Sequence, residues 1–217
     1  MKRALIAGAT GMVGSLVLEY CLASEKISEV IVLSRKSLSN THSKIEEVII
    51  ADFKDYSKQK AYFRNIDFAC FCIGAYTGKV SDAKFAEITI DYAVAFAQML
   101  KDQSPNACLC LLSGAGADRT EKSRISFAKY KGIAENRISA LQLGAFHTFR
   151  PSYIYPVQAR EEPNIMYRIS RFLYPVIKLV GKDASIQSTE LAQAMFNVGL
   201  NGAEKEILEN RDILKYV

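Results

Sequence analysis

Three glycines close to the start of the chain have the spacing of a turn that binds the phosphates of a dinucleotide. The apolar run Lys2–Ala7 leads into Gly8-Ala9-Thr10-Gly11-Met12-Val13-Gly14, and an apolar pattern at helical spacing follows. In a strand-turn-helix unit, Gly8 permits a tight turn, Gly11 lets the backbone approach the phosphates, and Gly14 lets the helix pack close to the strand. The first N–H groups of the helix then face the anion. The spacing G-x-x-G-x-x-G, between a strand and a helix, therefore predicts a dinucleotide site that includes Thr10, Met12 and Val13.

The residues at the end of the second predicted strand favour NADP(H) over NAD. In this type of fold a carboxylate at that position holds the ribose hydroxyls of NAD, whereas an arginine pairs with the extra phosphate of NADP. The chain has Ser34-Arg35-Lys36 there and no acid. A solvated basic loop is the alternative interpretation of these residues.

Two later segments are expected to complete the cofactor site. Asp52 follows the third strand and is placed to accept a hydrogen bond from the adenine amino group, with Phe53 packing beside the ring. Ile73, Gly74 and Ala75 end the fourth strand, where a small residue lets the cofactor pass close to the backbone.

Alternating apolar runs and helical patterns predict an α/β, doubly wound parallel sheet, the Rossmann fold. The runs are continuous, as expected where helices cover both faces of a sheet. After the first run, strands are expected over 29–33, 46–51, 67–73, 107–112 and 145–149, with long helices over 81–101 and 123–143.

The whole chain, 1–217, is expected to be a single NAD(P)-binding domain in which residues 151–217 form a small lobe on the substrate side. Within this lobe we expect a helix over 164–180, interrupted by Pro175, an amphipathic helix over 189–200 and a short late strand over 205–208.

Composition limits the other possibilities. A chain of 217 residues is long enough for one well-buried domain and short for two. The net charge of +5 is mild and its cations are scattered, so we expect no nucleic-acid partner. The five cysteines have no metal-ligand spacing, and buried free thiols suit a reducing cytosol. We also expect no signal peptide, no membrane span and a cytoplasmic protein.

The chain resembles the atypical short-chain dehydrogenases/reductases over nearly its whole length. The resemblance rests on GATGMVG, Asp52, CIGA (72–75), LLSGAGAD (111–118), Lys131-Gly132 and Phe149-Arg150-Pro151. The tail segments STELAQAMFNVGL and ILENRDI are similar to those of the branch that includes Tat-interacting-protein-like oxidoreductases. The resemblance also implies that Pro151 contacts the cofactor.

The resemblance implies a catalytic serine, tyrosine and lysine, with the tyrosine four residues before the lysine. Such a serine polarises the substrate carbonyl, the tyrosine transfers a proton, and the lysine lowers the tyrosine pKa and holds the nicotinamide ribose. Ser113 and Lys131 match two of these positions, but the tyrosine position is Phe127. Tyr130 precedes Lys131 directly, so its side chain is expected to point about 100° away around the helix.

Other tyrosines are candidates for the missing hydroxyl, and two functions remain open. Tyr76, Tyr153 and Tyr155 lie in loops expected on the substrate side, where half-buried structural aromatics are the alternative. One function is an NADP(H)-dependent oxidoreductase of non-standard mechanism acting on a small carbonyl or quinone-like substrate. The other is a non-catalytic NADP(H)-binding sensor or regulator that acts through a protein partner. The protein is expected to be a monomer or a homodimer, and no metal is expected.

Overall fold

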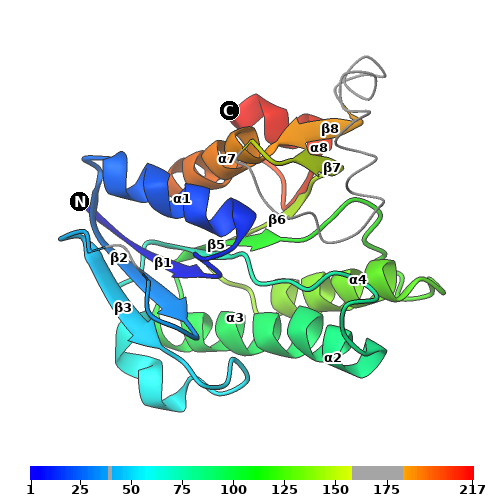
Figure 1. Cartoon of the computed structure of the whole chain (residues 1–217), viewed down its shortest axis with the longest axis horizontal. Coiled ribbons are helices and arrows are strands. Elements are labelled where there is room, and N and C mark those ends of the chain that lie inside the picture. The colour runs from blue at the N-terminus through cyan, green and yellow to red at the C-terminus, as the bar shows by residue number, and fades with distance from the viewer. Residues whose placement is uncertain (39–40, 158–182) are drawn as a thin grey trace.

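The centre of the molecule is one parallel sheet with the strand order of a doubly wound fold (Figure 1). The structure is a computed structural model that describes residues 1–38, 41–157 and 183–217. Seven strands pair in the order β3-β2-β1-β4-β5-β6-β9, and every pairing is parallel. They are β1 (Lys2–Ala7), β2 (Ile27–Ser34), β3 (Ile45–Ile49), β4 (Phe68–Phe71), β5 (Cys108–Leu112), β6 (Ala145–Arg150) and β9 (Ile207–Glu209). The order reverses between β1 and β4, and a crevice at the carboxyl ends of these two strands is where such folds bind ligands.

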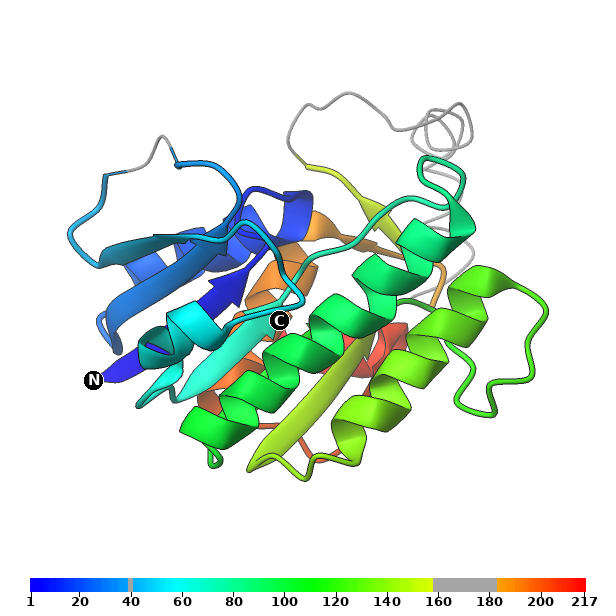
Figure 2. The ribbon, with the colours of Figure 1, turned by 90° about the horizontal axis from the view of Figure 1, so that it is seen from below.

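Helices cover both faces of the sheet. On one face α1 (Met12–Ala23) packs against α7 (Ser188–Asn201), and on the other α3 (Tyr92–Gln103) packs against α4 (Ser126–Ser139). Figure 2, which views the molecule from below, shows α3 and α4 side by side in front of the sheet. Since β1 is buried on both faces, Ala4 and Ile6 join the core under α1, while Leu5 and Ala7 join the core under α3. This two-sided burial explains the continuous apolar runs in the sequence.

The long helix expected over 81–101 is present but not uniform. It consists of α2 (Asp82–Ala86), a π-helical turn η2 (Glu87–Asp91) and α3. Ser81 caps the first turn, where its side chain accepts a hydrogen bond from the backbone N–H of Lys84. The other short helical segments are η1 (Ser57–Phe63), α8 (Asn210–Ile213) and η3 (Leu214–Tyr216).

Much of the tail lies within the main sheet and its helical layers. α7, expected as part of a lobe, packs over β4 and β5 beside α1, and β9 pairs with β6 as the seventh strand. The six strands expected from the main apolar runs are therefore joined by the short late one. β7 (Tyr153–Tyr155) and β8 (Ser185–Gln187) form a separate parallel pair that the sequence analysis did not predict. The helix expected over 164–180 lies outside the described residues.

Two kinds of feature are absent from residues 1–38, 41–157 and 183–217. No helix found there is long and apolar enough to cross a bilayer. Nor does any group of three or more His, Cys, Asp or Glu side chains in these segments have an arrangement that could hold a metal ion. The five cysteines are free thiols, and four of them are buried.

Candidate functional site

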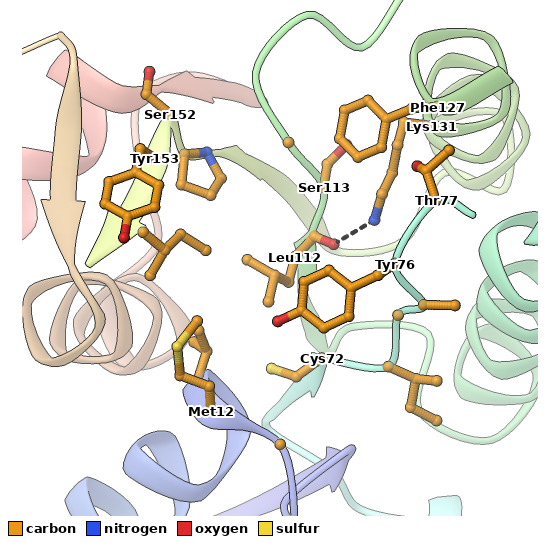
Figure 3. Close-up of a pocket in the computed structure, with 18 of the residues that line it drawn as sticks. Met12, Cys72, Tyr76, Thr77, Leu112, Ser113, Phe127, Lys131, Ser152 and Tyr153 are labelled. Atoms are coloured by element: carbon orange, nitrogen blue, oxygen red, sulfur yellow. Dashed lines mark hydrogen bonds between the residues drawn. The ribbon is translucent and has the colours of Figure 1, made fainter. Parts of the chain in front are cut away.

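A cavity of about 460 Å³ opens at the carboxyl ends of the central strands (Figure 3). Its walls come from the turn after β1, the loops after β4, β5 and β6, the strand β7 and the first turns of α4. Figure 3 shows Ser113, Phe127 and Lys131 together on one side, with Met12 and Tyr153 across from them. The lining residues are Gly11, Met12, Val13, Cys72, Ile73, Gly74, Ala75, Tyr76, Thr77, Leu112, Ser113, Gly114, Phe127, Lys131, Pro151, Ser152, Tyr153, Ile154 and Pro156.

The glycine turn has the geometry that the sequence analysis expected. Gly8 has a φ of 92°, in the left-handed region that favours glycine, and a Cβ there would lie 2.8 Å from the carbonyl carbon of Cys72. A Cβ on Gly14 would lie 2.2 Å from the carbonyl oxygen of Gly8, so only glycine lets α1 pack this close to β1. Gly11 is the N-cap of α1, and no acidic residue lies in the first turn of that helix. The helix start therefore faces the cavity with its positive end unneutralised.

The cavity collects most of the expected site residues from loops far apart in the sequence. Gly11, Met12 and Val13 line it together with Ile73, Gly74, Ala75, Ser113, Lys131 and Pro151. The remaining candidates lie outside its lining. Gly8 and Gly14 shape the turn from behind, and the others are Thr10, Ser34, Arg35, Lys36, Asp52 and Phe53.

The basic segment after β2 is exposed at Arg35 and Lys36 but not at Ser34. The Ser34 hydroxyl donates a hydrogen bond of 2.7 Å to the carbonyl oxygen of Lys36, so it holds the turn together. An acid that the sequence analysis did not consider lies beside this turn. Glu47 on β3 accepts hydrogen bonds from the Ser37 hydroxyl, at 2.7 Å, and from the Leu38 backbone N–H. The Ser37 hydrogen bond holds the pKa of Glu47 below its usual value.

The residues after β3 differ in part from the expectation. The Asp52 side chain is exposed and accepts a hydrogen bond of 2.9 Å from the backbone N–H of Lys54. The Phe53 side chain is only 4% exposed and belongs to the core under α3, so its packing beside an adenine ring stays a prediction. In that core it packs against Tyr56 and Tyr92. A large apolar ring gains more free energy in that core than at the protein surface.

Lys131 reaches the cavity from the second turn of α4. Its Nζ donates a hydrogen bond of 3.0 Å to the carbonyl oxygen of Leu112 at the end of β5. Burial lowers the pKa of Lys131 to about 8, although Glu135 and Cys72 act in the opposite direction. The ammonium is therefore fixed at the cavity wall and loses its charge at a lower pH than an exposed lysine.

Phe127 lines the cavity one helical turn before Lys131, and its ring lies over Gly114. A Cβ on Gly114 would be 2.5 Å from Phe127 Cζ, the atom that carries the hydroxyl in a tyrosine. Tyr76, Thr77 and Tyr153 also line the cavity and carry hydroxyl groups, whereas Tyr155 is not among the lining residues. Ser152 lines it too, but its hydroxyl donates a hydrogen bond of 2.6 Å to the carbonyl oxygen of Asp183. As expected, Tyr130 faces elsewhere: its hydroxyl donates a hydrogen bond of 2.6 Å to Asp82.

Ser113 belongs to a buried polar network that the sequence analysis missed. Its hydroxyl donates a hydrogen bond of 2.6 Å to Glu135, whose side chain is 0% exposed. Thr148, Arg119 and Arg150 also donate to this carboxylate. Glu135 follows Lys131 by four residues on α4, a spacing that places both side chains on one face of the helix. In an amphipathic helix, this spacing was the one feature of the sequence that could have pointed to Glu135 as a neighbour of the site.

The fold and the cavity together define the class as a Rossmann-type dinucleotide-binding protein. Residues 4–137 match the model of the NAD dependent epimerase/dehydratase family, and the chain belongs to that family. The branch of Tat-interacting-protein-like oxidoreductases stays a prediction.

Two curated relatives are similar in sequence. The chain is 27% identical over 154 residues to "Protein FMP52, mitochondrial" of Meyerozyma guilliermondii, which covers 70% of this chain and 65% of the relative. It is 23% identical over 218 residues to the protein of the same description from Emericella nidulans, covering 95% of this chain and 91% of the relative.

Solved structures are similar in fold. The Gre2 complex with NADPH from Candida albicans has a TM-score of 0.73 at 15% identity, and the match covers 96% of this chain and 78% of that one. The Bordetella bronchiseptica enzyme WbmH in complex with NAD+ has a TM-score of 0.71 at 15% identity, with 96% and 75% covered. At this identity the likeness extends to the fold alone.

Proposed function

We propose that this protein binds NADP(H) in the cavity and transfers hydride between the nicotinamide and a small carbonyl or quinone-like compound. The observation that carries the proposal is the meeting of two features at one cavity. The uncapped start of α1 after the glycine turn suits a pyrophosphate, and the fixed ammonium of Lys131 suits the hydroxyls of the nicotinamide ribose. Similarity in fold to complexes described with NADPH and with NAD+ supports a nicotinamide cofactor.

The preference for NADP(H) rests on Arg35 and Lys36. Both side chains are exposed at the end of β2, where the adenosine ribose lies in folds of this type. An arginine and a lysine there supply the donors that a ribose phosphate needs. Glu47 lies beside the same turn, but its carboxylate already accepts hydrogen bonds from Ser37 and Leu38.

Phe127 favours a second candidate function, that of an NADP(H)-binding protein without turnover that signals through a protein partner. Phenylalanine has no proton to transfer, and its ring closes the space over Gly114. The two functions share the cofactor site and differ only in whether hydride leaves the nicotinamide.

An assay of NADPH oxidation with a panel of aldehydes, ketones and quinones separates the two candidates. The oxidoreductase function is supported if the wild-type protein turns over a compound and the rate is about a hundredfold lower in Lys131→Met. Cofactor binding without turnover of any compound in the panel would favour the non-catalytic candidate. Absence of binding would contradict both.

A further inference from the structure

Glu135 is a buried carboxylate that receives five hydrogen bonds. On Oε1 the donors are the Ser113 hydroxyl at 2.6 Å, the Thr148 hydroxyl at 3.0 Å and Arg150 Nε at 3.1 Å. On Oε2 they are Arg150 Nη2 at 2.6 Å and Arg119 Nε at 2.9 Å. The four donor side chains come from β6 and from the loop that follows β5, so they converge on Glu135 from segments that also border the cavity.

The charges around this network keep the carboxylate ionised. Burial alone would raise the pKa of Glu135, but the hydrogen bonds from Arg150, Ser113 and Arg119 outweigh it and hold the pKa below its usual value. The two arginines are themselves anchored to the end of the chain, Arg119 by Glu206 at 2.6 Å and Arg150 by Glu209 at 3.0 Å. An ionised carboxylate has no proton to donate, so it can only accept.

The direction of the Ser113 hydrogen bond follows from that charge. A serine hydroxyl has one proton and two lone pairs. In this structure the proton is given to Glu135, and the oxygen keeps only acceptor capacity for anything in the cavity. If Ser113 turned its proton toward the cavity, the buried carboxylate would lose one of its donors. The free energy lost in this way is larger than that of losing an exposed hydrogen bond.

We propose that Glu135 is a positioning residue that fixes Ser113 as a hydrogen-bond acceptor, so that at Ser113 the cavity selects a ligand group that donates, such as an alcohol hydroxyl, over a carbonyl oxygen. This specificity rests on the proposed function for the identity of the cavity as the substrate site. It also changes the role that the resemblance implies for Ser113. With Phe127 beside it, neither of these two side chains has a proton to offer a carbonyl group.

The first test needs no ligand and measures the hydrogen bond itself. Ser113→Ala is expected to lower the folding equilibrium constant about tenfold in urea unfolding, because a buried carboxylate loses a donor. Thr148→Val, which removes the other hydroxyl from the same oxygen, is the matched control and is expected to have a similar effect. Unchanged stability of Ser113→Ala beside a destabilised Thr148→Val would show that the Ser113 proton is directed elsewhere, and would overturn the proposal.

The second test measures selectivity with cyclohexanol and cyclohexanone, two rings of similar size of which only the alcohol carries a hydrogen-bond donor. The alcohol is titrated into the NADPH complex and the ketone into the NADP+ complex, so that neither pair reacts. Ser113→Ala is expected to weaken alcohol binding about fivefold and to leave ketone binding within twofold. Ser113→Thr, which restores the hydroxyl, is expected to recover the alcohol, and Thr148→Val is expected to change neither affinity because Thr148 does not line the cavity.

The opposite pattern would overturn the proposal: a loss of ketone binding in Ser113→Ala that exceeds the loss of alcohol binding makes Ser113 a donor. Two other results would also overturn it. One is a wild-type protein that binds NADPH but neither probe, and the other is a Ser113→Ala variant that binds both probes with unchanged affinity. Failure of NADPH to bind would instead contradict the proposed function, while the unfolding experiment would still decide the direction of the Ser113 hydrogen bond.

Discussion

Phe127 places an apolar ring where the resemblance implies a proton donor, and its surroundings make the change testable. The ring lines the cavity one turn before Lys131, and its Cζ lies in the space that a side chain at Gly114 would occupy. Lys131 keeps the position and the fixed ammonium that a neighbouring tyrosine would need. At the scale of single residues, therefore, the site differs from a complete serine-tyrosine-lysine set in the Phe127 ring and in the Ser113 proton that is given to Glu135.

The substitution Phe127→Tyr is expected to raise the rate of NADPH-dependent carbonyl reduction about a hundredfold, because a positioned proton donor contributes on that order. Initial rates under saturating NADPH provide the measurement. Tyr130→Phe is the control: its hydroxyl bonds to Asp82 outside the cavity, so its rate should equal that of the wild type. Equal rates for Phe127→Tyr and the wild type would contradict this account of the cavity.

Lys131 is expected to make cofactor affinity dependent on pH. Because burial lowers the pKa of this lysine to about 8, the ammonium is present below that pH and is lost as the pH rises through it. Ribose hydroxyls that accept from the ammonium bind the charged form more tightly. NADPH affinity should therefore fall between pH 7 and pH 9 in the wild type, as measured by fluorescence titration.

The matched variant for this experiment is Lys131→Met, which keeps most of the length of the side chain and removes the charge. Its affinity should be weaker and nearly constant over the same pH range. If the wild type and Lys131→Met give parallel profiles, Lys131 is not the group that contacts the cofactor.

At the scale of elements, close contact between β1 and α1 sets the shape of the turn. Gly8 and Gly14 meet across it, and each lies so near to backbone atoms that no Cβ fits. Gly74 at the end of β4 is different: a Cβ there has nothing within 4 Å. Gly74 lines the cavity, so the absence of a side chain there leaves room for a ligand near the backbone.

Gly14→Ala is accordingly expected to reduce the free energy of unfolding by about 1–3 kcal/mol, since the new Cβ would force α1 away from β1. Gly74→Ala should leave stability within about 0.5 kcal/mol of the wild type and weaken NADPH binding. Urea unfolding and a cofactor titration on both variants test this contrast. A Gly74→Ala protein that binds NADPH as the wild type does would mean that the cofactor follows another path.

The elements that could be predicted from the sequence are those with a local pattern of apolar residues. The apolar runs of the main sheet and the long amphipathic helices carry local patterns, so the sheet and its main helices were predicted. The strands β7 and β8 pair across a separation of 30 residues, and no local pattern in the sequence indicates this pairing. Glu135 was missed for a related reason: its partners Arg150 and Arg119 are distant in sequence, and only the fold brings them together.

At the scale of the whole molecule, the end of the chain is part of the fold that supports the site. Leu191, Ala194, Met195 and Val198 of α7 are fully buried against the sheet, and β9 closes its edge. Glu206 and Glu209 bind the arginines that surround Glu135. The tail thus stabilises the main domain as well as bordering the cavity.

Gly199 tests this role of α7, because a Cβ there would lie 2.4 Å from Cδ2 of the buried Phe68 ring on β4. Gly199→Val is expected to lower the free energy of unfolding by about 1–3 kcal/mol in a single cooperative transition. Asn201→Ala, at an exposed position of the same helix, is the control and should change it by less than about 0.5 kcal/mol. Wild-type stability in Gly199→Val would contradict close packing of α7 on the sheet.

The most direct test of the central claim is a titration of the wild-type protein and of Arg35→Ala with NADPH and with NADH, side by side. The account predicts that the wild type binds NADPH at least tenfold more tightly than NADH, and that Arg35→Ala loses most of this difference while its NADH affinity is unchanged. Binding of neither nucleotide by the folded wild-type protein would contradict the account at its foundation.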